Sequence, residues 1–224
     1  HDSKQLMLEL VEKYRSRLDH DLNMDYKIRR GKVHMEIETL SKSVGAAMVI
    51  KGAHTVNAYE EPYRGNNLHK IITFTGCPII TVRNDFELKD SIDTILVPID
   101  TSGETIQKLP VIARIAGLFG STVHVVATHY SHLASLQRVT EKNVEKALTY
   151  FISHKIKVIS EKIVSNDITR AVIAHASNIQ ADLIVIMSEE ETPANIMLGP
   201  HAQQLINHSP VPVLSVHPGE KMEI

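Results

Sequence analysis

Histidine is the residue type in this sequence that most readily suggests chemistry, and the sequence contains thirteen of them. Three of these, His124, His129 and His132, fall within the segment HVVATHYSH, and imidazole nitrogens are common ligands of zinc. No cysteine or carboxylate stands at a spacing that would complete a ligand set around them. We therefore expect solvated loop histidines, and we expect no metal site.

Other reactive side chains have simpler interpretations. The run from Ser188 to Glu191 gathers three carboxylates, which suits Mg²⁺ or Ca²⁺ but is typical of a solvated loop. The single cysteine, Cys77, precedes a proline and aligns with Val211, so it indicates a small apolar position rather than a reactive thiol. No Ser-His-Asp order or carboxylate pair points to a hydrolase. We expect no catalytic residues.

Composition limits the partners of the chain. Its 224 residues carry 24 Lys and Arg against 26 Asp and Glu, so no positive field favours nucleic acid or an anionic membrane. No apolar run reaches the roughly 18 residues that would span a bilayer. One cysteine fits a reducing compartment. We expect a soluble, cytoplasmic protein that binds neither nucleic acid nor membrane.

An internal repeat organises the chain. Residues 46–52 match residues 181–188, and residues 65–82 match residues 199–216 at a constant offset. Upstream of each first match, apolar residues recur at helical spacing. The sequence therefore contains two copies of one α/β unit.

The polar segment 83–93 between the copies has the composition of a short linker. The predicted domains are residues 1–84 and residues 92–219. The first copy opens on a helix, with Leu6 and Leu10 at helical spacing, that corresponds to the second helix of the other copy. Because the first strand is central in a doubly wound sheet, we expect the natural protein to begin before His1.

The second copy alternates strands and helices. Its predicted strands are residues 93–100, 121–128, 157–164, 183–187 and 213–216. The first helical pattern begins near Glu104, contains Pro110 and ends at Gly120. The strands are apolar almost without a break, which favours a parallel, doubly wound α/β sheet covered on both faces.

The segment DTILVPIDTS before a helix, strands that end in Lys-Gly or Met-Ser, and the closing segments CPIITV and VPVLSV resemble the universal stress protein family. The resemblance covers nearly all of the chain as a tandem pair. It implies a flavodoxin-like five-stranded parallel sheet, two copies packed as a pseudo-dimer, and a bacterial-type stress-response or regulatory role. Some members of the family bind ATP and others do not.

The resemblance implies an ATP or anion site in the first copy. ATP-binding members carry G-x-x-G, nine residues, then Gly and Ser or Thr, because glycines let backbone N–H groups approach phosphate oxygens. Here the spacing from Gly52 to Gly65 survives, with Thr55 in place of glycine and Asn66 in place of Ser or Thr. We expect a weak or altered site. Its candidate residues are Gly52, His54, Thr55, Arg64, Gly65, Asn66 and Asn67.

The second copy departs further from this motif. Ser188 replaces the first glycine, three glutamates follow it in the loop, and Pro200 has no N–H to donate to a phosphate. Carboxylates beside a triphosphate repel it. We expect no ATP site here. Asp100 matches the family's adenosine-side acid, and we expect it to cap the turn at residues 101–103 or the helix that follows.

Three functions remain open at this point: a non-enzymatic stress-response or regulatory module, a nucleotide hydrolase or transferase of the same wider fold group, and a cytosolic regulatory domain of a larger transporter. We also expect the two copies to pack through residues 79–82 and 213–216, whose apolar edges would otherwise be exposed. A homodimer of the whole chain is a further assembly left open.

Overall fold

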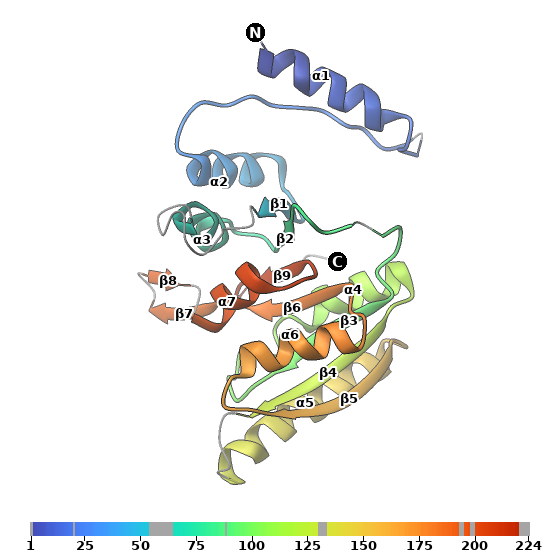
Figure 1. Ribbon diagram of the computed structural model, residues 1–224, viewed down its shortest axis with the longest axis vertical. Coiled ribbons are helices and arrows are strands. Elements are labelled where there is room, and N and C mark those ends of the chain that lie inside the picture. The colour runs from blue at the N-terminus through green and yellow to red at the C-terminus, as the bar shows by residue number, and fades with distance from the viewer. Residues whose placement is uncertain are drawn as a thin grey trace.

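A mixed seven-stranded sheet forms the centre of the computed structural model (Figure 1), which describes residues 2–19, 21–53, 65–87, 89–129, 134–192, 195–197 and 200–219. The order of its strands is β1-β2-β9-β6-β3-β4-β5. The strands are β1 (Val49–Ala53), β2 (Ile79–Arg83), β3 (Thr94–Ile99), β4 (Thr122–His129), β5 (Lys157–Val164), β6 (Leu183–Met187) and β9 (Val213–Val216). Every neighbouring pair is parallel except β2 and β9. The expected α/β fold is confirmed.

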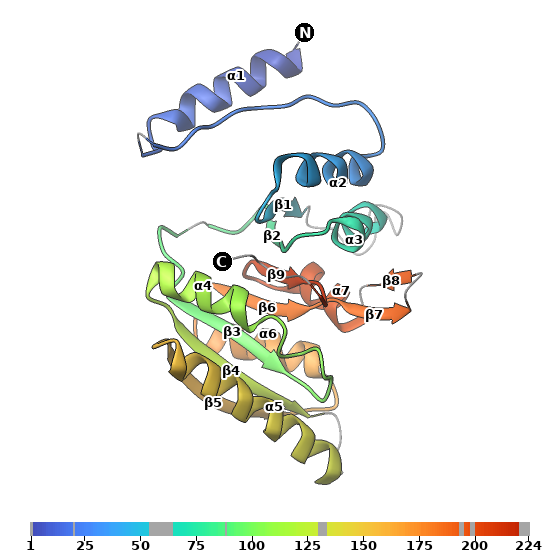
Figure 2. The same ribbon diagram turned by 180° about the vertical axis from the view of Figure 1, so that it is seen from behind.

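Seven helices accompany the sheet within the described ranges. They are α1 (Asp2–Arg15), α2 (Val33–Val44), α3 (Gly65–Phe74), α4 (Leu109–Phe119), α5 (Ala134–Ser153), α6 (Ile168–Asn178) and α7 (Pro200–His208). Apolar residues of α4 and α5 pack on one face of the sheet, and apolar residues of α3, α6 and α7 pack on the other. The two views separate these layers, because α4 and α5 stand in front of the sheet in Figure 2.

The core follows from the nearly unbroken apolar strands. Leu96 and Ile99 of β3 are fully buried, and Phe151 of α5 is fully buried against the same sheet. Consecutive residues of a strand point to opposite faces, so an apolar strand in the middle of the sheet serves both layers. Each large side chain buried in this way contributes roughly 1.5–3 kcal/mol.

The junction between β2 and β9 joins the two halves of the sheet. Its three Cα pairs are Ile79 with Ser215, Ile80 with Leu214, and Thr81 with Val213, and the strands run antiparallel. The Thr81 hydroxyl also donates a hydrogen bond of 3.2 Å to the Val213 carbonyl. The expected packing of these two strands against each other is confirmed.

Two details differ from the sequence prediction. Helix α4 begins at Leu109, not near Glu104, because Pro110 lies in its first turn, where the missing N–H costs nothing. The expected loop after β6 is wrong in part, since Glu189–Thr192 (β7) and Asn195–Met197 (β8) form a two-stranded antiparallel sheet. The other end of α4 agrees with the prediction: the helix ends at Gly120, which has a φ of 69° and whose N–H is bonded to Ala116 O.

Helix α1 is separated from the sheet by an extended segment (Figures 1 and 2), and its Leu6, Leu8 and Leu10 are exposed. The helix expected at this position is confirmed. Among the described residues, no helix has both the length and the apolar character needed to cross a membrane.

Candidate functional site

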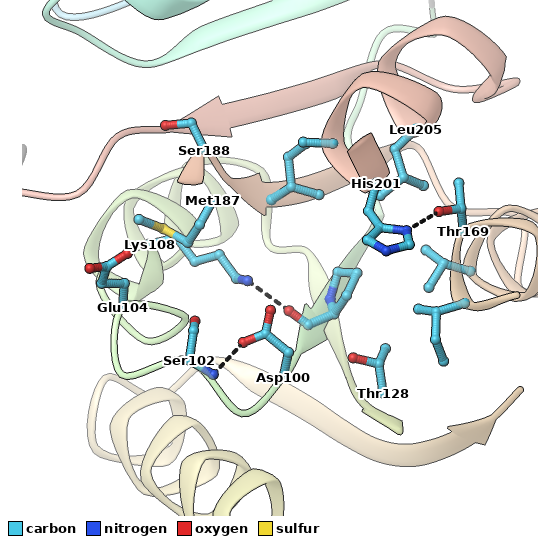
Figure 3. A pocket seen from close by; sticks show the side chains of 15 residues that line it. Asp100, Ser102, Glu104, Lys108, Thr128, Thr169, Met187, Ser188, His201 and Leu205 are labelled. Carbon is cyan, nitrogen blue, oxygen red and sulfur yellow. Dashed lines mark hydrogen bonds between the residues drawn. The ribbon is translucent and has the colours of Figure 1, made fainter. Parts of the chain in front are cut away.

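A cavity of about 190 Å³ opens at the carboxyl ends of β3, β4 and β6, between α6 and α7 (Figure 3). Asp100 follows β3, Thr128 lies near the end of β4, and Ser188 follows β6. In open α/β sheets this edge is where ligands bind. The cavity is smaller than the roughly 300–1,000 Å³ that small-molecule sites usually offer.

The loop after β3 is held by hydrogen bonds within it and by hydrogen bonds from one side chain of α5. The Asp100 carboxylate accepts from Ser102 N at 2.9 Å, and the Ser102 hydroxyl oxygen accepts from Thr105 N at 3.1 Å. From α5, the Asn143 amide donates to the carbonyls of Asp100 and Ser102 at 3.1 Å each. The predicted role of Asp100 as a cap of this turn is therefore confirmed.

Lys108 is a cation that the sequence gave no reason to place inside the protein. Its side chain is 2% exposed, and its Nζ donates to the Pro98 carbonyl at 2.6 Å and to the Thr105 hydroxyl at 3.4 Å. Burial lowers the pKa of Lys108 to about 8, and the nearby Asp100 carboxylate opposes that shift. Figure 3 shows Lys108 and Asp100 reaching toward each other across the cavity.

Two histidine contacts border the same cavity. The Thr169 hydroxyl and His201 Nδ1 lie 3.0 Å apart, which links α6 to α7 (Figure 3). The Ser188 hydroxyl is hydrogen-bonded to His217 Nδ1 and lies 3.3 Å from the Val216 carbonyl. Burial lowers the pKa of His217, which favours its neutral form. The two contacts of Ser188 link the end of β6 to the end of β9.

The structure describes only part of the candidate site in the first copy of the repeat. Gly52 is exposed near the end of β1, and Gly65, Asn66 and Asn67 form the first turn of α3. The expected start of a helix at these asparagines is confirmed. The other candidates, His54, Thr55 and Arg64, lie outside the described residues.

Lys51 is a residue of this region that sequence reasoning missed. Its ammonium donates a hydrogen bond to the Gly52 carbonyl, so a positive charge lies at the carboxyl end of β1. A Cβ on Gly52 would meet Asn84 Oδ1 at 3.6 Å, an ordinary contact. The fold itself therefore does not require glycine at position 52.

The other chemically suggestive residues have mixed outcomes. Cys77 is buried, as its proposed apolar position requires. His129 is only 3% exposed at the end of β4, so the expectation of a solvated histidine is wrong there, and burial lowers its pKa. His124 lies within the same strand with its side chain 15% exposed, so the expectation of a solvated loop histidine is wrong there too. His132 lies outside the described residues.

The fold and the cavity at the strand ends define a flavodoxin-like α/β protein. The sequence matches the universal stress protein family over residues 91–217, more than half of the chain, so the chain belongs to that family. No curated protein matches the chain.

Solved structures share this fold. A universal stress protein from Archaeoglobus fulgidus DSM 4304 is 18% identical with a TM-score of 0.72, and the match covers 98% of this chain and 77% of that one. A protein of Pseudomonas aeruginosa UCBPP-PA14 given the same family name is 18% identical with a TM-score of 0.66, over 97% and 79% of the two chains. A second Archaeoglobus fulgidus universal stress protein, 19% identical with a TM-score of 0.50, covers 55% of this chain and 98% of its own.

Proposed function

We propose that the chain is a non-enzymatic stress-response or regulatory module built from two tandem family domains, residues 1–84 and 92–219. One nucleotide or anion site lies in the first domain. The observation that carries this proposal is the Lys51 ammonium on the Gly52 carbonyl at the end of β1, the strand that precedes α3. A cation and the free N–H groups of a helix start both favour a phosphate.

The glycine at position 52 supports the same assignment. Gly52 is exposed, and its backbone would accept a Cβ without displacing Asn84. A glycine that folding does not require is well suited to let a ligand approach the backbone. The remaining candidates, His54, Thr55, Arg64 and Gly65 to Asn67, would complete this site.

The second domain lacks the same features. Its cavity of about 190 Å³ is small for a nucleotide, and Lys108 beside it is buried, whereas Lys51 is partly exposed. Helix α7 begins at Pro200, which offers no N–H there, and β7 carries three consecutive glutamates. We infer that this domain has lost the phosphate site and serves as a structural partner.

The pairing of β2 with β9 supports two tandem domains. Each strand is the last strand of its repeat, and the antiparallel pairing extends the two smaller sheets into one. Such a junction fixes the first domain against the second. Only β2 then separates a ligand held near β1 from the junction, which is a short path for a change in the first domain to reach the second.

Titration calorimetry of the chain with ATP, and separately with inorganic tripolyphosphate, tests this function. We expect the calorimetry to give one site per chain. In a phosphate-release assay, we expect no release from ATP above the buffer control. Lys51→Ala should weaken binding about tenfold, which corresponds to about 1.4 kcal/mol, because a charged hydrogen-bond donor is lost. The matched control is Lys146→Ala, which removes an exposed lysine of α5.

Three results would overturn the proposal. Phosphate release would indicate a hydrolase, two equivalent sites would place a ligand in both domains, and no binding of either probe would remove the site. Equal weakening by Lys51→Ala and Lys146→Ala would show that only net charge matters.

A further inference from the structure

Three side chains from separate elements converge on the face of the sheet that α6 covers. His124 comes from β4, Glu161 from the edge strand β5 and His175 from α6. His124 Nδ1 lies 3.2 Å from Glu161 Oε2, and His175 Nε2 lies 3.0 Å from the same oxygen. The three atoms lie within 4.8 Å of one another.

The core fixes this convergence. In the register of β4 and β5, Val126 is opposite Glu161, and His124 lies two residues from Val126 on the same face. Val126 packs in one core cluster with Val172 and Ala176 of α6, which places His175 over the two strands. The backbone positions of the cluster are therefore set by buried neighbours.

The chemistry of the three groups fits a transition metal. Two imidazole nitrogens and one carboxylate oxygen are a common zinc ligand set, with bonds of about 2.0–2.2 Å. Ligand atoms at that radius around a tetrahedral ion lie roughly 3.3 Å apart, close to the two measured separations. Small side-chain rotations would bring all three atoms onto one ion.

We propose that His124, Glu161 and His175 form a Zn²⁺ site with water as the fourth ligand. The side chains of the two histidines are 15% and 16% exposed, whereas that of Glu161 is 39% exposed, so the solvent reaches the cluster beside the carboxylate. An ion held by three protein ligands with such an opening keeps one coordination position for water.

The cluster is separate from the cavity at the strand ends, and it lies in the second domain, whereas the site of the proposed function lies in the first. His124 is the third residue of β4, and Thr128, which lines the cavity, lies four residues further, or roughly 13 Å along the strand. Bound zinc would join α6 to β5, the last strand of the sheet. Its expected consequence is structural, because an edge strand has only one neighbouring strand to hold it.

The alternative is a hydrogen-bonded bridge in which both imidazoles donate N–H groups to Glu161. That arrangement needs protons on the two nitrogens that a metal would occupy, so the two interpretations exclude each other at any one moment. Metal binding to the folded protein separates them.

The test is a calorimetric titration with ZnCl₂ of the protein from which a chelator has removed any bound metal. No nucleotide is present. We expect one zinc per chain at micromolar or lower Kd, and a rise in Tm of roughly 5 °C at a hundredfold excess over Kd. Glu161→Gln and His175→Gln should each weaken binding at least tenfold and abolish the rise in Tm. Glu161→Gln keeps the size of the side chain, and circular dichroism checks that both variants fold.

The matched control is His208→Gln, which removes an exposed histidine at the end of α7 and should leave zinc affinity unchanged. Cobalt offers a second readout, because Co²⁺ in a tetrahedral site absorbs visible light and the variants should lose that band. The absence of stoichiometric binding would overturn the proposal. Equal binding by the wild type and both ligand variants would also overturn it, since other histidines would then hold the ion.

Discussion

Ile80 of β2 and Leu214 of β9 are Cα partners in the antiparallel junction, and they also occupy the same position in the two copies of the sequence repeat. The flanking pairs are reciprocal, because Ile79 pairs with Ser215, the repeat equivalent of Thr81, and Thr81 pairs with Val213, the repeat equivalent of Ile79. A twofold relation between two copies requires this pattern, because the residue on the axis pairs with its own equivalent. The register therefore supports the tandem arrangement that we propose.

The junction should contribute strongly to stability. Leu214 is fully buried, so Leu214→Ala leaves a cavity and should lower the free energy of unfolding by about 2–5 kcal/mol. Leu118→Ala, on the exposed side of α4 where the side chain is 75% exposed, should change it by less than about 0.5 kcal/mol. Urea unfolding measures both. Similar losses in the two variants would contradict the central position of the junction.

Asp182 should anchor the segment that leads into β3. Its buried carboxylate accepts from the backbone N–H groups of Asp93 and Thr94 at 2.9 Å each and from Lys89 Nζ at 2.5 Å. Asp182→Ala strands two backbone donors, and we expect a loss of about 2–4 kcal/mol. Lys89→Ala removes only a largely exposed partner and should cost less than about 1 kcal/mol.

Chemical denaturation of the two variants checks this difference. If Lys89→Ala proved as harmful as Asp182→Ala, the ion pair, and not the pair of backbone hydrogen bonds, would hold the segment.

Lys108 should make stability depend on pH above neutrality. Its pKa is about 8 in the folded protein and near 10.5 in the unfolded chain, so between these values the unfolded chain binds more protons. The contribution of Lys108 to the free energy of unfolding therefore rises from pH 8 to pH 10.5, by up to about 3 kcal/mol. Lys108→Met should remove this rise.

Urea unfolding of the wild type and of Lys108→Met at pH 7.5 and pH 10 isolates the effect, because the other titrating groups are common to both proteins. Parallel pH dependence of the two proteins would show that the Lys108 ammonium is not destabilised by burial.

Much of the fold is predictable from local pattern. The order of helices and strands follows from the period of the apolar residues, and Gly120 marks the end of α4. The junction of β2 and β9 was predictable because two apolar strand edges need a partner. The hairpin of β7 and β8 was not, since three consecutive glutamates resemble a solvated loop when the pairing strand is unknown.

The side-chain clusters were harder to predict because they form between distant parts of the chain. His124, Glu161 and His175 share no short spacing, and only the register of β4 with β5 and the packing of α6 bring them together. Lys108 follows the same rule. From the sequence, a lysine next to a helix start is expected at the surface. Only the structure shows that the Pro98 carbonyl accepts a hydrogen bond from its ammonium.

The most direct test of the central claim, one anion site in the first domain and none in the second, compares two aligned glycines by calorimetry with ATP and tripolyphosphate. Gly65→Val should abolish binding, because a branched side chain at the first residue of α3 fills the space of the phosphate. Gly199→Val, the equivalent change in the second domain, should leave affinity unchanged. Loss of binding in Gly199→Val with retention in Gly65→Val would contradict the account.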